Sequence, residues 1–127
     1  MLDKNVINQW VDSGPTTKLI AQVEDFGRGL KHNKLSTSQI RQVFTRLKSI
    51  EAKGITEHQT EFLMLKPFIS YAASRFNARG LQDLKQAMDI GIDKVMAQGN
   101  TSLQTRFANF CSLFEAILAY HKAEGGN

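Results

Sequence analysis

Apolar residues recur at spacings of three and four along almost the whole chain, and this spacing constrains the fold more than any other feature of the sequence. The clearest stripe consists of Ile40, Val43, Phe44, Leu47 and Ile50. Only two prolines interrupt the chain, and no long stretch alternates Val, Ile and Thr with polar residues as a strand would. The pattern therefore predicts an all-α protein, a compact bundle of five to seven helices with no sheet.

The helix that carries this stripe has the best-marked ends. Ser36 can cap its first amides, and Gln39 stands where a capping box requires a glutamine or glutamate. Gly54 follows Lys53 and is a typical residue to end a helix. We therefore expect a helix over residues 37–53.

The helices after residue 54 are predicted from less complete signals. Thr56 is the expected N-cap of a helix that carries Phe62, Leu63 and Leu65 toward Pro67, where proline should break or kink it. A further helix over about 67–76 would turn Phe68, Ile69, Ala72 and Phe76 inward, and residues 77–80 read as a turn. The next helix carries Leu81, Leu84, Ala87, Met88, Ile92 and Val95. The last one carries Leu103, Phe107, Phe110, Phe114, Ile117 and His121.

A chain of 127 residues fits one domain, so residues 1–127 are predicted to form a single helical domain. Its N-terminal part, residues 1–14, would hold a short helix, and a loose attachment of this helix to the rest is left open. A second helix would follow Gly14-Pro15. The expected inward residues of these two helices are Val6, Ile7, Trp10, Leu19, Ile20, Val23 and Phe26.

A cytoplasmic location is expected. No run approaches the ~18 apolar residues that would span a bilayer. The first residues, Met1 to Asn5, open no signal peptide. A single cysteine, Cys111, cannot form a disulfide within the chain.

No constellation of side chains typical of an enzyme can be assembled, so neither catalytic nor cofactor-binding residues are predicted. The pairs Asp89/Asp93 and Glu57/Glu61 are spaced as charges on a solvated helix face are, and neither comes with a histidine or a third carboxylate. The three histidines are widely separated, so no metal site is expected. Cys111 stands beside Phe110 on an apolar face, where a buried small hydrophobe is expected rather than a nucleophile.

The basic residues are unevenly distributed, although the net charge is only +4. Between residues 27 and 49 there is no Asp or Glu, and the six basic residues there are Arg28, Lys31, Lys34, Arg41, Arg46 and Lys48. A cationic field concentrated on one stretch favours a polyanionic partner, of which nucleic acid is the commonest. A merely solvated face is the alternative, and composition alone does not decide between them.

The expected contacts are with phosphates rather than bases. Most phenylalanines fall at core-like positions, which leaves Tyr71, Tyr120 and Trp10 as the candidate exposed rings. Arg75 and Arg79 are four residues apart, and each could hold a phosphate in bidentate fashion. Because phosphate contacts carry no sequence information, a sequence-tolerant binder follows.

Three segments together resemble the small subunit of type III-A (Csm) CRISPR effector complexes. They are residues 35–41 (LSTSQIR), 65–75 (LKPFISYAASR) and 107–122 (FANFCSLFEAILAYHK). Their order and spacing fit that family, as does the length of the chain. The resemblance extends from about residue 20 to the end, and the first dozen residues match nothing.

The resemblance implies an all-helical, non-catalytic subunit of an antiviral, RNA-guided interference complex. Several copies would stack head to tail as a minor filament and hold the crRNA–target RNA duplex, mainly through the target-strand backbone. The implied partners are crRNA, target RNA, the backbone and large subunits of the Csm complex, and further copies of the chain, with no membrane. A homodimer of the isolated chain is left open. The RNA-binding residues carried over from the matching segments are Arg41 and Arg75; Lys34, Lys48, Arg46 and Arg79 are added from helix geometry.

Two other classes of protein stay open. Residues 35–41 and the basic amphipathic helix after them would suit a helix-turn-helix DNA-binding regulator. Against this, Phe44, Leu47 and Ile50 bury that helix, and Gln42 is the one amide obviously free to read bases. The other class is a helical adaptor that binds only protein.

Overall fold

Seven helices follow one another in the computed structural model, which describes residues 2–75 and 78–125. They are α1 (Lys4–Ser13), α2 (Thr17–His32), α3 (Thr37–Lys53), α4 (Gln59–Leu63), α5 (Leu65–Arg75), α6 (Arg79–Met96) and α7 (Leu103–Ala123). No strand occurs among the described residues. The prediction of an all-α bundle without a sheet is therefore confirmed.

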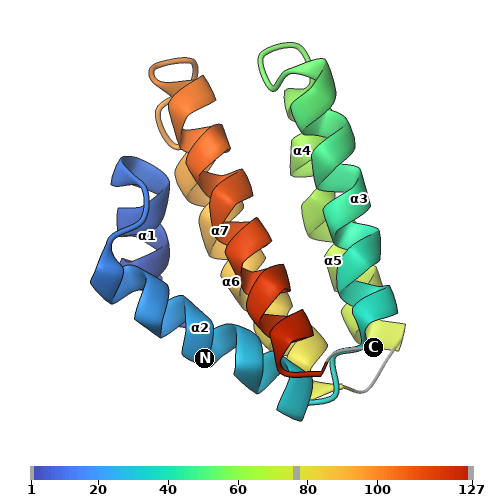
Figure 1. Ribbon diagram of the computed structural model, residues 1–127. Coiled ribbons are helices and arrows are strands. Elements are labelled where there is room, and N and C mark those ends of the chain that lie inside the picture. The colour runs from blue at the N-terminus through green and yellow to red at the C-terminus, as the bar shows by residue number, and fades with distance from the viewer. Residues whose placement is uncertain (1, 76–77, 126–127) are drawn as a thin grey trace.

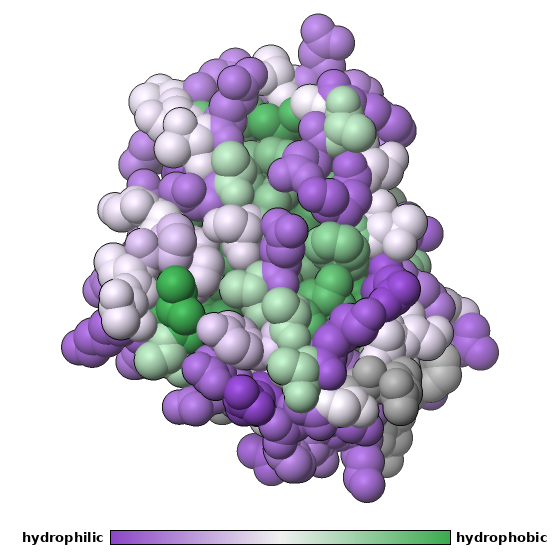
Figure 2. Space-filling model, viewed as in Figure 1, coloured by the Kyte–Doolittle hydropathy of each residue, from purple (hydrophilic) through white to green (hydrophobic). Residues whose placement is uncertain are grey.

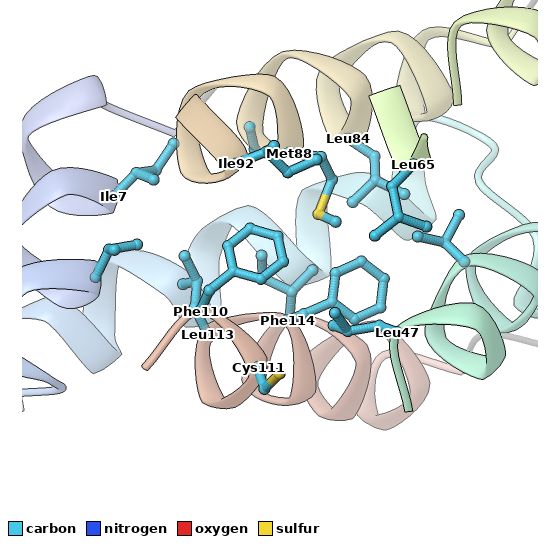
Figure 3. Close-up of a cluster of buried hydrophobic side chains, with 14 of the residues drawn as sticks. Ile7, Leu47, Leu65, Leu84, Met88, Ile92, Phe110, Cys111, Leu113 and Phe114 are labelled. Carbon is cyan, nitrogen blue, oxygen red and sulfur yellow. The ribbon is translucent and has the colours of Figure 1, made fainter. Parts of the chain in front are cut away.

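The central helix is α7, which packs against α1, α2, α3 and α6 (Figure 1). Because neighbours cover it on several sides, α7 is apolar around most of its circumference. Phe110 and Phe114 point from α7 toward Leu84, Met88 and Ile92 of α6 (Figure 3). This contact forms the middle of the core.

Phe62 packs the short helix α4 against α7. It comes from the short helix α4 and is fully buried. Its ring meets the rings of Phe107 and Phe110 edge to face, with centroids 5.1 and 5.2 Å apart. Such aromatic pairs add ~0.5–1.5 kcal/mol each beyond the area they bury, so α4 is anchored despite its five residues.

The predicted ends of α3 are confirmed. The amide of Gln39 donates to Ser36 Oγ at 3.1 Å, and the amide of Ser36 donates to Gln39 Oε1 at 3.0 Å, which completes the capping box. The helix ends at Gly54, whose φ of 95° suits glycine.

The boundaries expected for the next two helices are wrong. Thr56 does not cap α4, which starts at Gln59; the Gln59 side chain instead donates to the Thr56 carbonyl at 3.0 Å. The helix is interrupted at Met64, between α4 and α5, rather than at Pro67. Pro67 fits inside the first turn of α5 because amides there have no partner within the helix.

Residues 78–80 do not form the predicted turn, because α6 already begins at Arg79. Gly80 lies inside that helix and packs directly against the connection between α2 and α3. Its amide donates to the Asn33 carbonyl at 2.8 Å. Phe76 and Asn77, the other residues in the predicted inward stripe and turn, lie outside the described residues.

Two apolar residues expected to face inward are exposed. Ile20 is 38% exposed and Leu63 is 42% exposed. Each directly follows a buried residue in its helix, and consecutive helical residues point about 100° apart. Ile20 and Leu63 therefore point away from the buried stripe of their helices.

The N-terminal helix α1 is packed into the core. Val6, Ile7, Trp10 and Val11 are buried against α6 and α7. The Trp10 indole donates to Ser112 Oγ at 2.9 Å, which ties α1 to α7. Trp10, a candidate exposed ring in the sequence, is only 2% exposed and therefore belongs to the core.

Arg106 is a buried charged residue that the sequence reasoning did not single out. It is 2% exposed and lies at the start of α7. Its guanidinium donates to the carbonyls of Val95 at 2.8 Å and Gly99 at 3.2 Å, and also to the Thr101 carbonyl and the Gln98 side chain. One side chain thus holds the end of α6 and the whole α6–α7 connection. Its place on the apolar stripe, three residues after Leu103, was the one available signal.

Among the described residues, no helix has both the length and the apolar content needed to cross a membrane.

Candidate nucleic-acid interface

Four of the six predicted RNA-binding residues lie at one end of the molecule. Arg41 is in the second turn of α3, Arg75 is the last residue of α5, Arg79 is the first residue of α6, and Lys34 lies in the connection before α3. α3 begins, α5 ends and α6 begins at this same end (Figure 1, lower end). We call Lys34, Arg41, Arg75 and Arg79 the basic end. In the same view, the coloured side chains at the lower end of the molecule are mostly hydrophilic (Figure 2).

Backbone contacts bring Lys34 and Arg79 close to each other. The amide of Gly80, which follows Arg79, donates to the carbonyl of Asn33, which precedes Lys34. Arg79 Nε lies 4.0 Å from Asp83 Oδ2, the limit of an ion pair, and the Arg79 side chain is 79% exposed. Its guanidinium is therefore available to an anion in solution.

Arg41 and Lys34 are the most available cations of the basic end. Both side chains are exposed, and neither makes a hydrogen bond or ion pair within the part of the chain that the structure describes. Arg75 is exposed as well, and its guanidinium lies 5.7 Å from the centre of the Tyr71 ring.

The other two predicted residues, Lys48 and Arg46, lie farther along α3 and on opposite sides of it. Lys48 pairs with Glu51 at 2.6 Å, and this hydrogen bond raises the pKa of Lys48. It also approaches Phe44, which stacks on Phe114 of α7. Arg46 instead lies over the Phe68 ring of α5, 3.8 Å from its centre. The structure therefore separates these two residues from the basic end and from each other.

Lys34 has a backbone conformation that normally favours glycine. Its φ is 74°, and it follows the C-cap of α2. The amide of Leu35 donates to the Leu30 carbonyl at 3.0 Å, and the amide of Lys34 to the Lys31 carbonyl at 3.1 Å. This is a Schellman motif, whose left-handed position is usually glycine. A lysine there costs ~1–2 kcal/mol of backbone strain.

The surface beside the basic end, between α3 and α5, comes from two segments of the sequence that contain no carboxylate. One is residues 27–50, and the other is residues 62–82, which contain Lys66, Arg75 and Arg79 but no Asp or Glu. The sequence reasoning identified only the first segment. α3 and α5 pack together, so the surface between them joins both segments.

Arg28, by contrast, is neutralised. Its guanidinium donates to Glu24 at 2.8 Å and to Glu124 at 2.7 Å, and His32 contacts the same Glu124 at 2.6 Å. Hydrogen bonds from Arg28 and then His32 lower the pKa of Glu124. This network holds the C-terminal end of α7 against α2.

Cys111 and His121, the two reactive side chains on α7, are both buried in the core. Cys111 is buried, and burial, followed by the nearby Glu51, raises the pKa of its thiol to about 12. His121 is fully buried and donates from Nε2 to the Leu35 carbonyl at 2.6 Å. Among the described residues, no three His, Cys, Asp or Glu side chains lie where they could hold a metal ion.

The family model described as Csm2 Type III-A matches residues 13–127. This span contains α2 to α7 and the whole basic end, whereas α1 precedes it except for Ser13. No curated protein and no solved structure matches the chain.

Proposed function

Because the chain belongs to the Csm2 family of type III-A, and is therefore a small subunit of a type III-A CRISPR complex, we propose that it holds RNA within that complex without reading its sequence. The Csm2 family is a family of non-catalytic structural subunits, and membership implies assembly with other Csm subunits. The proposed ligand is the crRNA–target RNA duplex, contacted mainly along the backbone of the target strand.

The observation that carries this proposal is the basic end. Lys34, Arg41, Arg75 and Arg79 are exposed, come from three different helices and one connection, and lie at one end of the bundle. Cations that converge from separate elements form a surface suited to a phosphate chain. Contacts with phosphates fix position and affinity but not sequence, which suits a complex whose guide supplies specificity.

We further propose that copies of the chain stack head to tail as a minor filament. Each copy would then present its basic end to the RNA at a regular interval. A contact that is weak for one subunit becomes strong along the filament, because the later contacts form at high effective concentration.

The isolated protein should bind single-stranded RNA weakly and irrespective of sequence. The logarithm of the affinity should fall with the logarithm of salt concentration by ~0.7 for each phosphate contacted. Arg41→Ala and Arg75→Ala should each weaken binding severalfold and reduce this slope, as fluorescence anisotropy with labelled oligoribonucleotides would measure.

Lys94→Ala is the matched control for this titration. It removes one positive charge from the opposite part of α6, where Lys94 pairs with Asp12 at 3.1 Å. All three variants should unfold within ~0.5 kcal/mol of the wild type. An arginine whose removal collapses the fold is structural. Sequence-specific binding of duplex DNA would favour a helix-turn-helix regulator, and no RNA binding at low salt would favour a protein-only adaptor.

Lys34→Gly should make the protein more stable and a weaker RNA binder. Glycine removes the strain of the left-handed backbone and should raise the free energy of unfolding by about 1 kcal/mol. The lost charge should weaken RNA binding, because the Lys34 ammonium belongs to the basic end. Urea denaturation and the anisotropy titration measure the two effects separately.

Lys34→Ala separates the backbone from the charge. Alanine is disfavoured at positive φ as lysine is, so this variant should lose RNA affinity without gaining stability. If Lys34→Gly stabilises the protein and binds RNA as the wild type does, Lys34 does not contact RNA.

A further inference from the structure

A small pocket lies between α3 and α5, beside the basic end. It encloses about 230 Å³ and is lined by Ser36, Ser38, Gln39, Gln42, Val43, Phe68, Ala72 and Leu81. Its apolar residues come mainly from α5 and α6, and its polar residues come from α3 and the cap before it. The pocket is therefore apolar on one side and rich in hydrogen-bonding groups on the other.

The polar side of the pocket combines a fixed amide with a free one. The Gln39 carboxamide is held by the capping box, because its Oε1 accepts from the Ser36 amide. Gln42 is exposed at the mouth, and its carboxamide has no hydrogen-bond partner within the described residues. A glutamine side chain offers both a donor and an acceptor, so Gln42 can pair with planar groups of different hydrogen-bonding pattern.

Cations border the pocket, and its walls carry no carboxylate. Arg46 lies over Phe68, one of the lining rings, at 3.8 Å. Arg75 follows Ala72 by three residues on the same helix. The wall segments, residues 36–43 and 68–81, belong to the two stretches without Asp or Glu. This charge distribution favours a ligand whose flat apolar part is attached to an anion.

We propose that this pocket receives one nucleobase of the bound RNA strand. The proposal rests on the proposed function and adds a base contact to its phosphate contacts. The base packs against Phe68 and Ala72, Gln42 meets its edge, and Arg75 and Arg46 face the adjoining phosphates. The volume of the pocket is below the ~300–1,000 Å³ typical of sites for drug-sized ligands. A single nucleobase is smaller than such a ligand, so the small volume suits it. Because an amide that can turn over accepts more than one kind of base, the contact preserves sequence tolerance.

The test compares two oligoribonucleotides of equal length, one with bases and one whose riboses carry none. Both present the same phosphates, so their affinity ratio isolates the base contact. The wild type should bind the base-bearing strand at least about fivefold more tightly, which corresponds to the lower end of ~1–3 kcal/mol per stacked base. Ala72→Met fills the pocket without changing any charge and should lower this ratio toward one while leaving affinity for the abasic strand unchanged.

Two further variants complete the design. Ala119→Met places the same side chain on an exposed position of α7, outside the pocket, and should keep the wild-type ratio. Gln42→Ala alters an exposed residue in the second turn of α3 and should also lower the ratio, even if Ala72→Met fails to fold.

Each other outcome contradicts a different claim. Equal affinity of the wild type for both strands overturns the nucleobase pocket and leaves the proposed function standing. If the protein binds neither strand, both the proposed function and the assignment of a nucleobase to the pocket are overturned. If Ala72→Met keeps the wild-type ratio but prevents incorporation into a Csm complex, the pocket holds a protein side chain instead.

Discussion

Replacing Arg106 with methionine should lower the free energy of unfolding by about 3 kcal/mol. The guanidinium donates to one carbonyl at the end of α6 and to two carbonyls and one side-chain oxygen in the α6–α7 connection, and it is almost fully shielded from water. Methionine fills a similar volume but leaves these acceptors without a donor. Urea denaturation should detect the loss, and the midpoint of thermal unfolding should fall by about 10 °C.

Two control variants show whether the fork of hydrogen bonds causes this loss. Arg106→Lys keeps the charge but cannot donate in several directions from one plane, so it should recover only part of the stability. Arg41→Met makes the same chemical change at an exposed position and should leave stability within ~0.5 kcal/mol of the wild type. Equal stability of Arg106→Met and the wild type would show that water satisfies these carbonyls.

Replacing Gly80 with alanine should destabilise the protein by about 1–3 kcal/mol, the usual cost of overpacking. A Cβ at this position would lie 2.8 Å from the Leu30 carbonyl oxygen, 2.8 Å from Leu35 Cβ and 2.9 Å from the Leu35 amide nitrogen. Two of these neighbours are backbone atoms, so a rotamer change cannot relieve the clash. The start of α6 must move away from the α2–α3 connection instead.

Gly29→Ala provides the matched control for Gly80→Ala. Gly29 also lies inside a helix, and a Cβ there would meet nothing within 4 Å. Alanine is favoured over glycine in a helix, so Gly29→Ala should stabilise the protein by ~0.5–1 kcal/mol. Gly80→Ala should also weaken RNA binding, because it separates Arg79 from Lys34. A stabilising effect at both glycines would mean that α6 does not depend on this close approach.

Local signals were sufficient to predict part of the fold. Ser36, Gln39 and Gly54 lie within or next to α3, and the interactions that begin and end this helix involve neighbouring residues. The buried stripes of α6 and α7 follow from spacing for the same reason. A helical period survives in the sequence wherever one face of a helix is buried.

The ends of α4 and α6 depend on contacts that spacing does not show. The helix is interrupted at Met64, two residues after Phe62, which packs in the core against Phe107 and Phe110. Gly80 resembles a turn residue in the sequence, yet it is there because another backbone passes beside it. Where two segments distant in the sequence pack closely together, the glycine at the contact is the one sign of that contact in the sequence.

The sequence predicts the candidate RNA-binding residues one by one but not their arrangement. Arg41 and Arg75 come from the family resemblance, whereas Lys34 and Arg79 are added from helix geometry. That they share one end follows from the packing of α6 on the α2–α3 connection. The partners of other cations come from distant positions, as Glu124 does for Arg28, and no local pattern shows which charges are already neutralised.

The protonated state of Cys111 determines how this protein can be labelled. Its thiol is buried, points to the side of α7 turned away from the Phe110–Phe114 cluster (Figure 3), and has its pKa raised to about 12. Since the thiolate is the form that reacts with maleimides, the native cysteine should stay unmodified at neutral pH. A second cysteine introduced on the surface would then be the selective attachment point for a dye or a photocrosslinker. Neighbouring molecules could be mapped in this way without altering any native residue of the core.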